Sequence, residues 1–284
     1  MHQDFTLHTH TDAFDGRNSV AQMVAQASDL GMSAIGISNH FILHPNIKNT
    51  NFYPYAIRGG YESMYNSSFD EIMRKFTVHY QDVERVAASA GIRVLRGMEA
   101  DFFYSDTWLR DFKRAISILQ PDYIIGAAHF IEMNNQLYNV HDIEHAHPDI
   151  RNQMLNLYWA KVCDAAKSGL FTWMAHLDLP KKVGAGLSSS WQDKEQCAID
   201  TLTAFNTPIE INTSRRFADC FTYPCPRILK MVASAGLPVL LSDDAHVVGH
   251  IGRNFDRAAH LMKMYGIKNH LTLQKTLDFS NKTL

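Results

Sequence analysis

The chain alternates between short apolar runs and longer stretches whose apolar residues recur at helical spacing. The first helical stretch begins after Ser19, ends before Gly31 and carries apolar residues three and four positions apart. The same spacing predicts helices over 19–30, 68–90, 106–119, 150–168, 190–205, 226–235 and 257–264. The apolar runs predict strands over 4–10, 33–40, 92–101, 122–130, 171–178, 208–213 and 237–246.

Apolar strands that alternate with amphipathic helices are typical of a parallel sheet covered on both faces. Seven such units in 284 residues predict an α/β fold of the TIM-barrel type, a (β/α)7 barrel closed one unit short of eight. We expect residues 1–284 to form one domain. We expect two inserts, 44–66 and 132–149, to be loops, and nothing in the first is strongly periodic.

Polar residues with metal-binding side chains stand at the ends of these strands. His8 and His10 are two residues apart, so a strand would point both rings to one side, and Asp15 follows within reach. Chemistry in such barrels sits at the carboxyl ends of the strands. Any one of these histidines could belong to the core or to a loop, but their convergence on one rim predicts a metal site. The strand-end residues are His8, His10, His40, Glu99, His129, His176, Asn212, Asp244 and His246.

A set of nitrogen and oxygen ligands without sulfur suits zinc, manganese or iron. There are too many ligands for one ion, so we expect two or three divalent ions, with Glu99 as a bridging carboxylate.

Composition narrows the function classes further. The formal net charge of −2 leaves no basic footprint for nucleic acid as a main partner. No secretory signal and no membrane-length apolar run is visible. The four cysteines form no Cys-x-x-Cys pair, which predicts reduced thiols in a cytoplasmic protein.

The order of these motifs resembles the polymerase-and-histidinol-phosphatase (PHP) family of metal-dependent hydrolases, and within it the bacterial histidinol-phosphate phosphatases. The resemblance extends from about residue 4 to about residue 256. It rests on His8-x-His10, Phe14-Asp15-Gly16, His40, Gly97-Met-Glu99-Ala-Asp101, Asp122-Tyr-Ile-Ile-Gly-Ala-Ala-His129-Phe, Ala175-His176-Leu-Asp178-Leu, Glu210-Ile-Asn-Thr213 and Ser242-Asp-Asp244-Ala-His246. It implies a distorted seven-stranded barrel.

Position by position, the resemblance implies three ions. The first would bind His8, His10, Glu99 and Asp244, the second Glu99, His129 and His176, and the third Asp15, His40 and His246. Glu99, Asp244 and His246 would then serve catalysis around a water shared by two ions. The chain departs from the family pattern at Asn39, where relatives usually carry an acidic residue.

A phosphate ester also needs cationic side chains beyond the metals. Arg215 and Arg216 follow the sixth strand, and Lys181 and Lys182 follow the fifth, so all four are candidates for phosphate binding or ordinary surface charges. For the organic part of a substrate, the inserts offer aromatic residues and carboxylates, and Asp101 is a further candidate at the rim.

Three function classes remain open. The first is a phosphomonoesterase that acts on a small-molecule phosphate ester such as L-histidinol phosphate, in histidine biosynthesis. The second is the same machinery acting on another phosphoester, such as a nucleotide or an oligonucleotide end. The third is a non-catalytic metal-binding module, which missing ligands would indicate.

Overall fold

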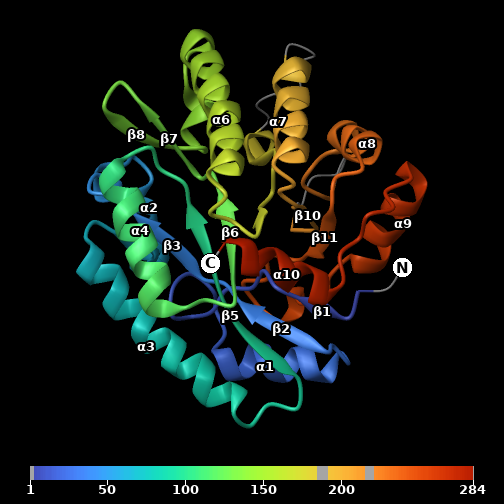
Figure 1. Cartoon of the computed structure of the whole chain (residues 1–284). Coiled ribbons are helices and arrows are strands. Elements are labelled where there is room, and N and C mark those ends of the chain that lie inside the picture. Colours follow the sequence, from blue (N-terminus) through green and yellow to red (C-terminus); the bar gives the residue numbers. More distant parts are fainter. Residues whose placement is uncertain (1–2, 184–190, 215–220, 284) are drawn as a thin grey trace.

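The computed structural model describes residues 3–183, 191–214 and 221–283, and these build a nearly closed barrel of parallel strands surrounded by helices (Figure 1). Its strands follow the order β1 (Phe5–Thr6), β2 (Ala34–Ile37), β5 (Arg93–Asp101), β6 (Tyr123–Ala127), β9 (Trp173–Met174), β10 (Ile209–Asn212) and β11 (Val239–Ser242). Beyond the first and last strands, Thr9 and Ala245 form a parallel bridge. The predicted barrel of seven parallel strands is confirmed.

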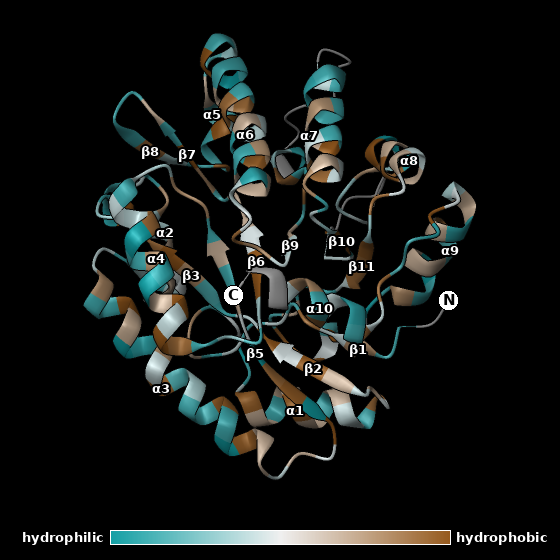
Figure 2. Cartoon of the chain, in the orientation of Figure 1, coloured by the Kyte–Doolittle hydropathy of each residue, from teal (hydrophilic) through white to brown (hydrophobic). Residues whose placement is uncertain are grey.

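The helices that cover the barrel agree with the predicted ones to within a few residues. They are α1 (Val20–Asp29), α3 (Phe69–Ala87), α4 (Asp106–Leu119), α6 (Pro148–Ser168), α7 (Gln192–Ala204), α8 (Pro226–Ala235) and α9 (Phe255–Tyr265). Figure 2 shows hydrophobic residues along the strands, whereas the helices alternate between hydrophobic and hydrophilic colours. Ser19 begins α1 as a cap: its side chain accepts from the Gln22 backbone N–H, and the Gln22 side chain accepts from the Ser19 N–H.

An unpredicted helix, α10 (Leu273–Thr283), closes the end of the barrel opposite to the strand ends that carry the polar residues. Leu271 and Leu277 join the apolar core inside the barrel, and the Ser280 hydroxyl donates to the Asp122 carbonyl just before β6. The same core contains Tyr123, which lies across Gly36 and Gly97; a Cβ at either glycine would come within 2.0–2.2 Å of the tyrosine ring or hydroxyl. These two glycines therefore make room for the Tyr123 ring in the apolar core inside the barrel.

The insert over residues 44–66 is not a loop, so this prediction is wrong. It contains a 3-10 turn (Ile47–Asn49), α2 (Tyr53–Gly59) and β4 (Tyr65–Asn66), which pairs in parallel with β3 (His40–Leu43). Pro54 in the first turn and a left-handed Gly60 bound α2, but a helix of seven residues is too short to show an apolar period.

Two further details differ from the prediction. The second predicted strand is two strands, so that His40 begins β3 instead of ending β2 and pairs with Glu99 of β5. The insert over 132–149 includes a hairpin of β7 (Phe130–Met133) and β8 (Gln136–Asn139), turned by Asn134 and Asn135 with positive φ, and the short α5 (Asp142–His145). Among the residues that the structure describes, none of the helices has the length and hydropathy needed to cross a lipid bilayer.

Candidate metal centre

Nine side chains converge where the barrel strands end. The first and last strands deliver four of them, because the bridge between Thr9 and Ala245 places the segment after β1 beside the segment after β11. The nine residues are His8, His10, Asp15, His40, Glu99, His129, His176, Asp244 and His246. All nine are the strand-end and turn residues that the sequence predicts as ligands.

Glu99 lies at the centre of this group and is almost fully buried. Its Oε1 faces two histidines, with the Nε2 atoms of His176 and His129 at 3.0 and 3.5 Å. Its Oε2 lies 2.9–3.6 Å from ring nitrogens of His8, His10 and His40. The two oxygens therefore face different sets of histidines, which is the arrangement of a carboxylate that bridges two ions.

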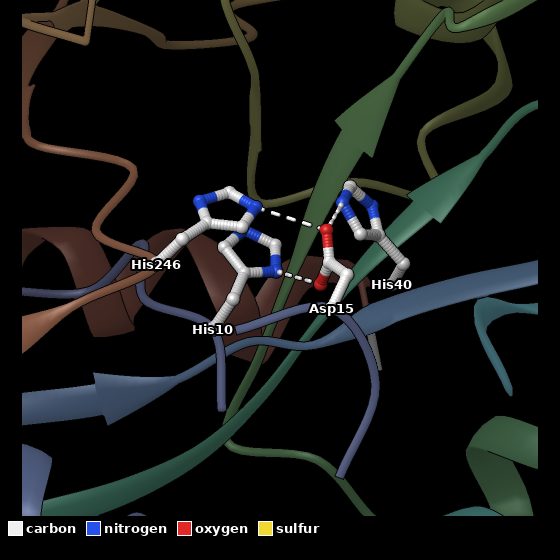
Figure 3. Close-up of side chains that lie close together, drawn as sticks. All are labelled: His10, Asp15, His40 and His246. Atoms are coloured by element: carbon white, nitrogen blue, oxygen red, sulfur yellow. Dashed lines mark hydrogen bonds and ion pairs between the residues drawn. The ribbon is translucent and has the colours of Figure 1, made fainter. Parts of the chain in front are cut away.

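Asp15 collects a second set, which we call the Asp15 group: His10, Asp15, His40 and His246. Figure 3 shows the Asp15 carboxylate between the rings of these histidines. Its Oδ2 lies 3.0 Å from His246 Nε2 and 3.3 Å from His40 Nε2, and its Oδ1 lies 3.6 Å from His10 Nδ1. His10 thus joins this group as well as the group around His8 and Asp244, which the family resemblance did not imply.

The distances between these atoms fit divalent metal ions. Two ligands at about 2.1 Å from one tetrahedral ion lie about 3.4 Å apart. His10 Nε2 is 3.3 Å from Asp244 Oδ1, and His8 Nε2 is 3.7 Å from the same oxygen. Several of these buried atoms have no hydrogen-bond partner among the described residues, and an ion would supply the missing partner. They are His8 Nε2, His10 Nδ1 and Nε2, Asp15 Oδ1, His40 Nδ1, Glu99 Oε2 and His176 Nδ1.

The electrostatics of the group favour ionised carboxylates. Burial alone would raise the pKa of Glu99, but His40, His8 and His129 outweigh burial and hold this pKa well below its usual range. The pKa of Asp15 is likewise low, because His246 and His40 outweigh its burial. Burial, together with His246 and His40, lowers the pKa of His10 to about 4, so its ring is neutral at pH 7.

Two carboxylates outside the group fix the rings of its histidines. Glu210 accepts from His8 Nδ1 at 2.9 Å, and Asp101 accepts from His129 Nδ1 at 2.9 Å and from the His129 backbone N–H at 2.7 Å. Both contacts turn the Nε2 atom of the histidine toward Glu99. The sequence signal for Glu210 is a carboxylate inside an apolar strand, which needs buried donors. Asp101, a candidate for substrate binding in the sequence, is hydrogen-bonded to His129 instead.

Of the four predicted phosphate ligands, the structure describes the side chain of Lys181 alone. Arg215 and Arg216 lie outside the described residues, as does the side chain of Lys182. Lys181 is buried and its Nζ lies 3.1 Å from Asp178 Oδ2 and 3.0 Å from Glu195 Oε1. This geometry lends no support to Lys181 as a phosphate ligand, and for the other three the assignment stays a prediction.

Comparisons with known proteins agree with this architecture. Residues 5–214 match the model of the PHP domain family. A protein of Deinococcus radiodurans named "Probable histidinol-phosphatase" is 24% identical over 265 residues, which cover 91% of this chain and 92% of that protein. The crystal structure of a candidate histidinol phosphatase from Listeria monocytogenes has the same fold, with a TM-score of 0.66 and 19% identity over 89% of this chain and 99% of the other. So does histidinol phosphate phosphatase from Lactococcus lactis, complexed with zinc, L-histidinol and phosphate, with a TM-score of 0.65 and 16% identity over 95% of each chain.

Proposed function

This chain belongs to the PHP domain family and is a hydrolase of the phosphatase class, and from that premise we propose that it is a metal-dependent phosphomonoesterase acting on L-histidinol phosphate. The observation that carries the proposal is the buried Glu99, whose two oxygens face separate sets of histidines. A carboxylate in this position would hold two ions close enough together to act on one phosphate.

We assign the ligands to three ions of zinc, manganese or iron. The sets are His8, His10, Glu99 and Asp244; Glu99, His129 and His176; and Asp15, His40 and His246, with His10 within reach of the third. Bound there, divalent ions would lower the pKa of water toward neutrality and balance the charge of the phosphoryl oxygens.

The side chains of the centre divide the remaining work. Glu99 holds the two halves of the centre together, while Glu210 and Asp101 keep His8 and His129 in the orientation that presents Nε2. Asp244 and His246 are the most exposed of the nine, with 18% and 34% of their side chains accessible. A substrate therefore approaches from their side of the centre, while the buried side excludes bulk water.

The choice of substrate rests on the relatives and on the inserts over the rim. The relative from Deinococcus radiodurans aligns over nearly the whole chain, and the structure from Lactococcus lactis holds L-histidinol and phosphate. In this chain the two inserts meet, since Phe52 stacks on His141 with ring centroids 5.2 Å apart. L-Histidinol phosphate carries an ammonium and an imidazole group. The carboxylates and aromatic rings of the two inserts suit both groups. A nucleotide or an oligonucleotide end is the alternative substrate, which the net charge of −2 disfavours.

Steady-state kinetics test the substrate. We expect kcat/KM for L-histidinol phosphate to exceed that for glycerol phosphate by at least about 100-fold, which corresponds to about 2.7 kcal/mol of transition-state binding. A nucleoside monophosphate serves as the comparison for the alternative, and a preference for it would move the chain to that class. Metal analysis of protein purified without chelator should give more than one ion per chain, and a stoichiometry of one would contradict the multinuclear centre.

A further inference from the structure

Asn39 joins the segments that carry Asp15 and His40. Its buried side chain makes two hydrogen bonds to Thr11: Oδ1 accepts from the Thr11 backbone N–H at 2.8 Å, and Nδ2 donates to the Thr11 hydroxyl at 2.8 Å. The Thr11 carbonyl in turn accepts from the N–H groups of Phe14 and Gly16, so Thr11 begins the turn that carries Asp15. Asn39 therefore fixes this turn against the strand that begins at His40.

The second hydrogen of the Asn39 amide goes to His79 on α3. Asn39 Nδ2 lies 3.0 Å from His79 Nε2, and His79 is buried, with 4% of the residue exposed. Burial lowers the pKa of His79 to about 4, so the ring is neutral at pH 7 and Nε2 accepts the hydrogen bond. The His79 ring also meets the edge of Phe14, which precedes Asp15, with centroids 5.8 Å apart. Helix α3 thus supports the Asp15 turn at two points.

This support matters because, among the described residues, the ring nitrogens of the Asp15 group pair only with other residues of the metal centre. His8 and His129 each donate Nδ1 to a carboxylate outside the ligand set, Glu210 and Asp101. Both ring nitrogens of His10, and Nδ1 of His40, make no hydrogen bond to any residue that the structure describes. Their orientation therefore depends on the backbone segments that carry them and on the carboxylates of the centre itself.

We propose that Asn39 and His79 are positioning residues for the Asp15 group and determine how tightly this group holds its ion. The Asn39 amide donates in two directions and accepts in a third, which a carboxylate cannot do. The backbone carbonyl of Asn39 also accepts a hydrogen bond from the Glu99 backbone N–H at 3.1 Å. Asn39 therefore fixes the Asp15 turn, His40 and Glu99 relative to one another. The inference rests on the proposed metal centre and is independent of the organic part of the substrate.

Three variants of α3 test this role. His79→Phe keeps a buried ring but removes the acceptor for Asn39, whereas His79→Gln offers a side-chain carbonyl at a similar distance from the backbone. Tyr80→Phe is the matched control: it removes a buried hydrogen bond from the next residue of α3, from the Tyr80 hydroxyl to the Gly97 carbonyl at 2.9 Å. The metal-loaded proteins are titrated with a chelator, and the ions remaining per chain are counted by elemental analysis.

We expect His79→Phe to release one ion at a chelator concentration about 10- to 100-fold lower than the wild type does, while its other ions stay bound. His79→Gln should restore most of the retention, and Tyr80→Phe should retain ions as the wild type does despite lower stability. The proposal is overturned if His79→Phe releases every ion at the same chelator concentration as the wild type. It is also overturned if His79→Phe loses all its ions at one lowered chelator concentration, with none released before the others. If His79→Phe cannot be purified, Thr11→Ala removes the hydrogen bond that Asn39 Nδ2 donates to the Thr11 hydroxyl, and unchanged retention in that variant has the same meaning.

The experiment also separates this inference from the proposed function. A wild-type chain that binds at most one ion overturns both the metal centre and the role of His79. A wild-type chain that binds several ions but does not hydrolyse L-histidinol phosphate overturns only the substrate, and the comparison of ion retention remains valid.

Discussion

Replacing Glu210 with glutamine should cost the protein both stability and tight binding of one ion. The Glu210 carboxylate is fully buried and accepts four hydrogen bonds. Oε2 accepts from His8 Nδ1 at 2.9 Å and Trp173 Nε1 at 3.1 Å, and Oε1 accepts from the His176 N–H at 3.0 Å and Asn212 Nδ2 at 2.7 Å. Glutamine keeps one acceptor oxygen, so its NH2 group must face one of these two pairs of donors.

Either orientation removes two buried hydrogen bonds to a charged acceptor, at about 1.5–3 kcal/mol each, or about 3–6 kcal/mol of unfolding free energy in total. If the NH2 group faces His8, the imidazole proton must move to Nε2, the atom that faces Glu99 and Asp244. If it faces the His176 N–H, the backbone of that ligand is displaced. In both cases we expect affinity for one ion to fall about 10- to 100-fold.

Urea unfolding of the metal-free protein measures the first effect, and chelator titration of the loaded protein measures the second. Tyr158→Phe is the control, because it removes one buried hydrogen bond to the Leu177 carbonyl, next to His176, without touching a ligand ring. This control should lose about 1 kcal/mol and no ion. A Glu210→Gln protein within about 1 kcal/mol of the wild type, with its ions retained, would refute the reasoning.

Three further changes have definite expected outcomes. Glu99→Gln should lower turnover by orders of magnitude with an unchanged circular dichroism spectrum, and near-normal turnover would contradict its bridging role. Glu195→Gln leaves the buried ammonium of Lys181 and the Arg227 guanidinium with less compensating charge, so urea unfolding should show a loss of about 3 kcal/mol; no loss would mean that the cluster relaxes freely. The pKa of His79 is lowered from 6.5 to about 4 in the folded state, so the unfolded chain binds the proton first as the pH falls, and stability present above pH 6.5 is lost toward pH 4. Metal-free wild type should therefore lose about 2 kcal/mol more than His79→Gln between pH 7 and pH 5, and equal losses would place His79 in contact with water.

The strand ends are the part of the site that the sequence predicts best. An apolar run that stops at His129 or His176 shows both where the strand is buried and where its chemistry begins, and parallel strands bring these ends to one rim. The contacts that orient the ligands are harder to predict, because they join residues far apart in the chain. Asn39 and His79 illustrate this, since neither the apolar strand nor the amphipathic helix shows that the two side chains meet.

The elements that sequence reasoning missed are those that local patterns describe poorly. Helix α2 has a proline at its start and a glycine at its end but only seven residues, so tertiary packing decides its conformation. Helix α10 begins after Thr272, whose carbonyl and hydroxyl bond to the first turn, and its few apolar residues are explained only by the open end of the barrel that they cover.

The bridge between Thr9 and Ala245 has a consequence for how the protein is made. The ribosome synthesises His8 and His10 236 residues before it reaches Asp244 and His246, respectively (244 − 8 and 246 − 10). A nascent chain can fold its early strands and helices as they emerge, yet it has only part of the metal centre until the last strand pairs with the first. A full set of ligands therefore exists only after residue 246 has been synthesised and has folded against the first strand, and a chain that terminates before residue 244 lacks ligands that no later folding can replace.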